Sequence, residues 1–126
     1  MTEEGTRYEG GLADGGALKT RGEGSPYRRF FAYEFSPSSN LTLIRVSGQV
    51  RVGNPGIQAV LTYAEPQGGN PNILLLRLDL FQRPGFWPEV VVYVPADYTG
   101  ISEEGPYDQV QITNPYLGDI TIPVFH

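Results

Sequence analysis

The sequence predicts an all-β fold, either an antiparallel β-sandwich or a small barrel, of about seven strands. Two long stretches, 41–52 and 73–81, alternate apolar and polar residues with a period of two, which is typical of half-buried strands. Between the expected strands, clusters containing proline or glycine recur at about the length of one strand plus one turn. No segment of ten residues has helical spacing without a proline or glycine. Together these features favour a fold built from sheets alone.

The first 26 residues differ from the rest of the chain. They hold seven of the sixteen glycines and only scattered apolar side chains, such as Tyr8, Leu12 and Leu18. Such a segment buries too little apolar surface to offset the entropy that it loses on ordering. We therefore predict an extended, glycine-rich N-terminal arm over 1–26 and a β-sandwich domain over 27–126.

Seven strands are expected after the arm. In chain order they lie at 27–35, 41–52, 58–64, 73–81, 89–94, 109–113 and 119–125. The segment 95–100 (PADYTG) is expected to be a turn, because proline and glycine are common turn residues.

Two of these strands have a clear apolar face. That of 41–52 consists of Ile44, Val46, Val50 and Val52, and that of 73–81 consists of Leu74, Leu76, Leu78 and Leu80. Gly48 interrupts the first face, which predicts a bulge, a bend or the close approach of another backbone. Pro123 lacks a backbone donor, so we expect the last strand to be an edge strand or to end in a bulge.

Length and composition exclude several classes of protein. With 126 residues, the chain can form one hydrophobic core. Cysteine is absent and the one histidine is His126, so a Ser-His-Asp triad or a zinc site has almost nothing to be built from. We therefore expect no catalytic, cofactor or metal site. The N-terminus is acidic and no apolar run approaches the roughly 20 residues of a membrane helix, so we expect cytoplasmic synthesis without a signal peptide or transmembrane segment.

Charge is unevenly distributed along this acidic chain. The net charge of −5 argues against nucleic acid or an anionic membrane as the main partner. Residues 27–85 hold six arginines, whereas 86–126 hold six acidic residues and no basic one. Either the basic and acidic halves of one domain pair with each other, or the charges form complementary surfaces between copies or partners.

The candidate interaction residues are mainly aromatic. Trp87, Tyr98, Tyr107 and Tyr116 lie in or next to turns of the C-terminal half. Flat rings beside polar loops stack on sugars or anchor a protein partner. For Trp87 there is an alternative, in which it plugs one end of the core together with Phe86.

Two charged clusters are candidates for sites of other kinds. Arg28 and Arg29 precede the aromatic run FFAYEF, and interleaved basic and aromatic residues can bind single-stranded nucleic acid. The negative net charge instead favours a core strand with the two arginines near its beginning. The acidic residues Asp97, Glu103, Glu104 and Asp108 lack the alternating spacing of a calcium loop, so we expect a solvated loop.

These observations favour a non-catalytic structural or assembly protein. In this interpretation the N-terminal arm packs on neighbouring subunits, as in a coat or a particle-decorating protein, and the partner is another copy or another protein. After synthesis such a chain would be incorporated into a particle. The alternative is a ligand-binding module, with carbohydrate as the leading ligand and aromatic residues of the C-terminal turns as the binding groups. An enzyme is least favoured, because only carboxylates, Tyr, Ser and Arg could carry its chemistry.

Overall fold

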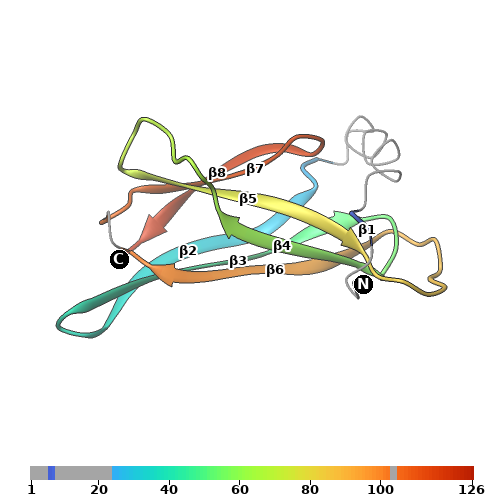
Figure 1. Cartoon of the computed structure of the whole chain (residues 1–126), viewed down its shortest axis with the longest axis horizontal. Helices are drawn as coiled ribbons and strands as arrows, with labels where there is room; N and C mark the ends of the chain where they lie inside the picture. Colours follow the sequence, from blue (N-terminus) through green and yellow to red (C-terminus); the bar gives the residue numbers. More distant parts are fainter. Residues whose placement is uncertain (1–5, 8–23, 103–104) are drawn as a thin grey trace.

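The computed structural model describes residues 6–7, 24–102 and 105–126 (Figure 1). Its strands are β1 (Thr6–Arg7), β2 (Tyr27–Ser38), β3 (Leu41–Val52), β4 (Ile57–Tyr63), β5 (Ile73–Gln82), β6 (Val92–Ile101), β7 (Gln109–Asn114) and β8 (Gly118–Phe125). These ranges contain no helix, and so none that is long and apolar enough to cross a membrane. The predicted all-β class is confirmed, and each of the seven expected strands overlaps one of β2 to β8.

The strands form one mixed sheet that is nearly closed into a barrel (Figure 1). The long strands follow the order β6-β3-β2-β8-β7-β5-β4, and the two end strands, β4 and β6, lie close together. The expectation of purely antiparallel pairing is wrong at two places, because β2 pairs with β8 and β5 pairs with β7 in parallel. After β5 the chain crosses the sheet to form β6 beside β3, and it returns as β7. A crossover connection of this kind permits parallel neighbours.

Part of the expected N-terminal arm belongs to the sheet. The short strand β1 pairs antiparallel with the end of β5, with Thr6 opposite Gln82 and Arg7 opposite Phe81. Most of the predicted arm, residues 1–5 and 8–23, lies outside the described residues.

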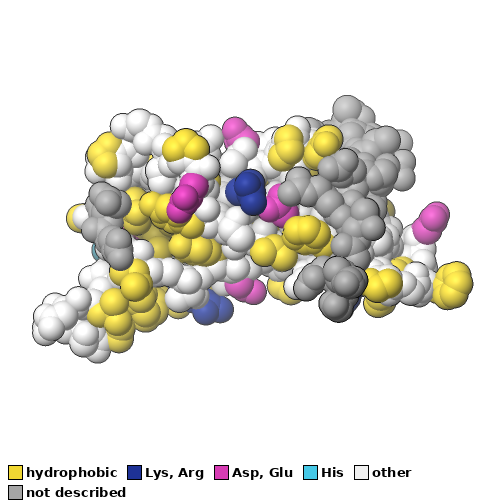
Figure 2. All heavy atoms as spheres, viewed as in Figure 1, with side chains coloured by type: hydrophobic (Ala, Val, Ile, Leu, Met, Phe, Trp, Pro, Cys, Tyr) yellow, Lys and Arg dark blue, Asp and Glu magenta, His cyan; other side chains and the backbone are white. Residues whose placement is uncertain are grey.

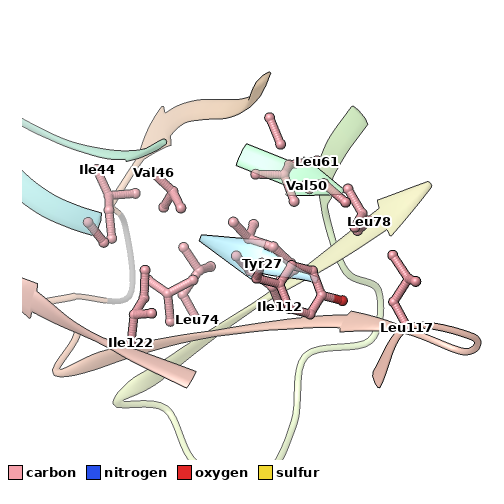
Figure 3. Packing of buried hydrophobic residues seen from close by; sticks show 14 of the residues in the cluster. Tyr27, Ile44, Val46, Val50, Leu61, Leu74, Leu78, Ile112, Leu117 and Ile122 are labelled. Carbon is pink, nitrogen blue, oxygen red and sulfur yellow. The ribbon is translucent and has the colours of Figure 1, made fainter. Parts of the chain in front are cut away.

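The core lies inside the nearly closed sheet, where side chains from several strands point toward one another (Figure 3). The predicted apolar faces of β3 and β5 are confirmed, since all eight of their side chains are at most 3% exposed. Val110 and Ile112 of β7 complete the core between these faces, and neither is exposed.

A β-bulge interrupts the pairing of β2 with β3. Two residues of β2, Arg29 and Phe30, lie opposite the single residue Gly48. Arg29 has φ 59°, which is in the left-handed region that non-glycine residues seldom adopt and that bulges can require. The Phe30 ring covers Gly48 so closely that a Cβ there would lie 2.2 Å from a ring carbon. The predicted irregularity at Gly48 is thus confirmed, although an aromatic ring is what approaches it.

Two expectations based on prolines are wrong. The segment PADYTG lies within β6 and forms no turn. Pro95 is tolerated there because β6 is an end strand of the sheet, so one of its edges faces no paired strand. The last strand, β8, lies between β7 and β2 and is not an edge. Its ladder to β2 begins at Val124, directly after Pro123, and so needs no donor from the proline.

Candidate interaction surface

The outer face of β2 carries three aromatic rings in a row, Phe31, Tyr33 and Phe35, which we call the aromatic strip. The rings of Phe31 and Tyr33 are stacked, with centroids 6.0 Å apart and planes 7° apart. The Tyr33 and Phe35 centroids are 5.5 Å apart. Phe31 is 46% exposed and Phe35 is 37% exposed. The strip is therefore a continuous row of rings in contact with solvent.

The pairing with β3 determines that these rings face outward. Residues opposite each other on neighbouring strands point to the same side of the sheet. Ala32 lies opposite the buried Val46. Glu34 lies opposite the buried Ile44. The alternate residues of β2 therefore point outward.

The expectation that FFAYEF is a core strand is wrong for the aromatic strip. Tyr27 is buried, so simple alternation from it would bury Phe31 as well. The bulge inserts one residue between them and inverts the buried face.

Neighbouring strands widen the strip into a larger apolar patch. Phe125 of β8 lies opposite Tyr33. Leu43 of β3 lies between Phe35 and Ile101 of β6. We call this patch the aromatic face, and its members are Phe31, Tyr33, Phe35, Leu43, Ile101 and Phe125. Phe125 is 62% exposed and Ile101 is 56% exposed. Contiguous apolar patches of this kind mark interaction sites.

One arginine lies within the aromatic face. Arg45 lies opposite Tyr33, and its guanidinium is 3.9 Å from the carboxylate of Asp97 and 3.4 Å from the hydroxyl of Thr99. The Asp97 carboxylate accepts a shorter hydrogen bond, of 2.6 Å, from Ser47. Because an exposed ion pair of this length contributes little stability, Arg45 can pair instead with a carboxylate of a binding partner.

The loop between β5 and β6 (83–91) is fastened at its base. The Arg83 guanidinium donates hydrogen bonds to the carbonyl oxygens of Pro55 (3.1 Å) and Gly56 (3.3 Å). The Trp87 indole N–H donates to the Arg83 carbonyl oxygen at 2.9 Å. The indole also covers Gly56, where a Cβ would lie 2.4 Å from it. These contacts anchor Arg83 and Trp87 to the turn before β4.

The tip of this loop exposes apolar side chains. Phe86 is fully exposed, and Val90 and Val91 are about half exposed. The alternative prediction that Phe86 and Trp87 plug the core is wrong for Phe86, because the bond from Trp87 to the base of the loop turns the residues between them outward. Trp87 is half-buried against Gly56, outside the core cluster.

The predicted arginines lie toward the other end of β2. Arg28 donates a 2.8 Å hydrogen bond to the Gln49 side chain, and its guanidinium carbon lies 3.5 Å from the centroid of the Tyr93 ring. Arg28 is therefore engaged within its own sheet. Arg29 is exposed at the bulge.

The three predicted tyrosines do not form a common surface. Tyr107 is 3% exposed and belongs to the core. Tyr98 is half-buried on β6, where burial, and secondly the nearby Tyr63, raise its pKa. Tyr116 is 45% exposed in the turn between β7 and β8. Sequence reasoning therefore missed the aromatic face, although the alternation within FFAYEF could have indicated the aromatic strip.

A hollow of about 390 Å³ opens beside the loop between β4 and β5. Its lining consists of Tyr63, Gln67, Gly68, Gly69, Asn70, Pro71, Ile73 and Tyr107. The Gln67 side chain donates to the carbonyl oxygens of Ala64 and Leu75 at 2.7 and 2.8 Å. It also accepts a bond from the Leu75 N–H at 2.9 Å. These three bonds hold the loop against β5.

Glu34 is a buried carboxylate surrounded by polar partners. Its Oε2 accepts hydrogen bonds from the Ser102 hydroxyl and from the Tyr107 backbone N–H, and its Oε1 lies 3.0 Å from His126 Nε2. In a nucleophilic site the imidazole lies between the serine and the carboxylate. Here the carboxylate lies between the serine and the imidazole, so the cluster fastens the C-terminus and does not activate the serine.

Among the described residues, no group of three or more His, Asp or Glu side chains is placed to hold a metal ion. Comparison with known proteins found no matching family, no matching characterised protein and no matching solved structure. The candidate site therefore rests on the aromatic face and the exposed loop themselves.

Proposed function

We propose that this chain is a non-catalytic assembly protein that binds a second copy of itself through the aromatic face. The supporting observation is the exposure of four large apolar side chains on β2, β6 and β8: Phe31, Phe35, Ile101 and Phe125 are between 37% and 62% exposed. Burying one such side chain fully contributes about 1.5–3 kcal/mol. Because these side chains are already partly buried, a partner that covers the face gains roughly half of this amount from each of them.

The setting of these side chains favours a protein partner. The rings are held by paired strands, so binding orders few additional groups and loses little entropy. Aromatic and arginine residues are enriched at the energetically dominant positions of protein interfaces, and Arg45 supplies the arginine here.

Absolute mass from light scattering on a sizing column tests this proposal. We expect the wild-type chain to form oligomers whose mass rises with concentration, and the Phe31→Ser/Phe35→Ser variant to remain monomeric. The control is Tyr63→Ser, which removes a side chain of comparable exposure (41%) from β4 and should assemble like the wild type. A wild-type chain that is monomeric at every concentration would contradict the proposal.

The further expectations, that the arm over 1–26 lies on a neighbouring subunit and that the protein enters a particle, remain predictions. Most of that segment lies outside the described residues.

Carbohydrate binding is a second candidate because of the hollow beside the loop between β4 and β5. Tyr63, 41% exposed, offers a ring at this hollow, and Asn70 offers an amide. Rings that stack on a sugar, next to groups that bond its hydroxyls, are typical of such sites.

Titration calorimetry with a panel of oligosaccharides tests this second candidate. We expect binding heat for the wild type that is lost in Tyr63→Ala. Tryptophan fluorescence is unsuitable, because Trp87 lies against Gly56, near the opposite end of β4 from Tyr63. Absence of binding heat across the panel would contradict carbohydrate binding.

A further inference from the structure

Two apolar surfaces lie near opposite ends of this molecule. The aromatic face extends to Ile101, the last residue of β6, whereas the exposed loop 83–91 directly precedes the first residue of β6. Figure 1 shows the loop projecting from one end, while the β2–β3 hairpin and the end of β6 lie at the other. In Figure 2, hydrophobic side chains are visible at both of these ends. Phe86 therefore cannot reach the Ile101 end of the aromatic face of its own chain.

We propose, on the basis of the proposed function, that assembly is head to tail: the loop 83–91 of one copy places Phe86 on the aromatic face of the next copy. The proposal names the second copy as the occupant of the face and Phe86 as its anchor. Three features of the described residues support it.

The first feature is the pre-formed shape of the loop. The Trp87 indole is bonded to the Arg83 carbonyl oxygen, and the Arg83 side chain is bonded to the turn before β4. Phe86, between these two anchored residues, is held in solvent without burial in its own chain. Because the residues on both sides of Phe86 are already anchored, the backbone that carries the ring loses little entropy on binding, which favours Phe86 as an interface anchor.

The second feature is apolar complementarity. The loop presents Phe86 with Val90 and Val91, which are 48% and 49% exposed. The aromatic face presents further aromatic and aliphatic side chains that are also partly exposed. Contact between the two surfaces removes both from water, and ring pairs add about 0.5–1.5 kcal/mol beyond the buried area.

The third feature is charge complementarity. Glu89 is exposed on the loop and makes no side-chain hydrogen bond or ion pair within the described part of the chain. Among the described residues, the one ion pair of Arg45, within the aromatic face, is the 3.9 Å contact with Asp97. A copy docked through Phe86 brings an acidic residue to a face that holds a loosely paired arginine.

A head-to-tail contact differs from a symmetric one in its consequences. Because the two contacting surfaces are different, one copy keeps a free face and the other keeps a free loop after the first contact. Such contacts generate rings or open filaments, whereas face-to-face packing of two aromatic faces stops at a dimer.

Mixing two variants tests this inference. The loop variant is Phe86→Ser. Because the Phe86 side chain is fully exposed, its replacement should not affect folding. The face variant is Phe31→Ser/Phe35→Ser, and circular dichroism checks that both variants are folded. Each variant alone should be monomeric, with self-association weakened at least about 30-fold, as expected for loss of an interface anchor.

The mixture should form a one-to-one dimer and no larger species. In it, the intact loop of the face variant binds the intact face of the loop variant, and no second contact is available. Native mass spectrometry with one variant isotopically labelled identifies the mixed dimer.

The alternative outcomes separate this inference from the proposed function. If the loop variant assembles like the wild type while the face variant is monomeric, the head-to-tail contact is overturned and the aromatic face remains the assembly site. If two folded, monomeric variants fail to form a mixed dimer, the head-to-tail contact is likewise overturned. A wild-type chain that never self-associates overturns both proposals.

Discussion

Gly48→Ala should destabilise the protein because the added methyl group would clash with the Phe30 ring. An alanine Cβ at this position would lie 2.2–2.4 Å from three carbons of the Phe30 ring, whereas ordinary contact begins at 3.4 Å. Phe30 packs against the core and meets Tyr27 edge to face, with centroids 5.9 Å apart, so the ring cannot retreat freely. Overpacking of this kind costs about 1–3 kcal/mol. Since alanine is otherwise better than glycine in a strand by roughly 0.5–1 kcal/mol, we expect a net loss of about 1–2 kcal/mol.

A double-mutant cycle with Phe30→Ala measures this effect. The free energy of unfolding comes from urea denaturation followed by far-ultraviolet circular dichroism. In the Phe30→Ala background the clash is gone, so Gly48→Ala should be neutral or stabilising there, which gives a coupling energy of at least about 1 kcal/mol. Gly69→Ala is the control, because a Cβ at Gly69 meets nothing within 4 Å. An equal loss of stability from Gly48→Ala in both backgrounds would refute the reasoning, since the Phe30 ring would then not be the obstacle.

Three further sets of substitutions test hydrogen-bonded polar groups, with urea unfolding as the assay. Tyr27→Phe removes a 2.7 Å hydrogen bond to the Gly118 carbonyl oxygen and should cost about 1 kcal/mol. Burial raises the pKa of Tyr27 above its ordinary value of about 10, so above that pH the hydroxyl ionises more readily in the unfolded chain than in the folded one. The wild type should therefore lose stability as pH rises above about 10. An equally steep loss in Tyr27→Phe would contradict this cause. Asn114→Ala leaves two N–H groups of the β7–β8 turn and one carbonyl of β5 without their side-chain partner, so it should cost about 2–3 kcal/mol, and a loss below about 0.5 kcal/mol would show that other groups replace it. Glu34→Ala and His126→Ala each remove the same 3.0 Å contact, so their double substitution should cost less than the two single losses together, and additive losses would argue against coupling.

From the sequence, the type of residue in the candidate surface could be predicted, but not the particular residues. Composition directed attention to aromatic residues, but the expected residues were those of the C-terminal turns, whereas the aromatic face lies on β2, β3, β6 and β8. Trp87 lies in the fastened loop, yet it is its neighbour Phe86 that is exposed. Whether a ring beside a turn is buried depends on contacts with distant residues, such as that between Trp87 and Gly56, and local sequence does not contain them.

The apolar pattern of the sequence was enough to predict where most strands lie and which faces of β3 and β5 are buried. A period of two is a local property, because successive side chains of any strand point to opposite sides. The apolar faces of these two strands therefore indicate core residues even when the neighbouring strands are not known.

Which side of β2 faces solvent depends instead on its pairing with β3. Taken alone, this strand would bury its aromatic side, yet pairing with β3 buries Ala32 and Glu34 and exposes the aromatic strip. The bulge opposite Gly48 shifts the register by one residue, and a shift of one residue exchanges the two faces of a strand. Parallel neighbours and the near closure of the sheet likewise arise from contacts between residues far apart in the chain. Such contacts are set by how the whole sheet buries its core, and for that reason the aromatic face appears only in the folded protein.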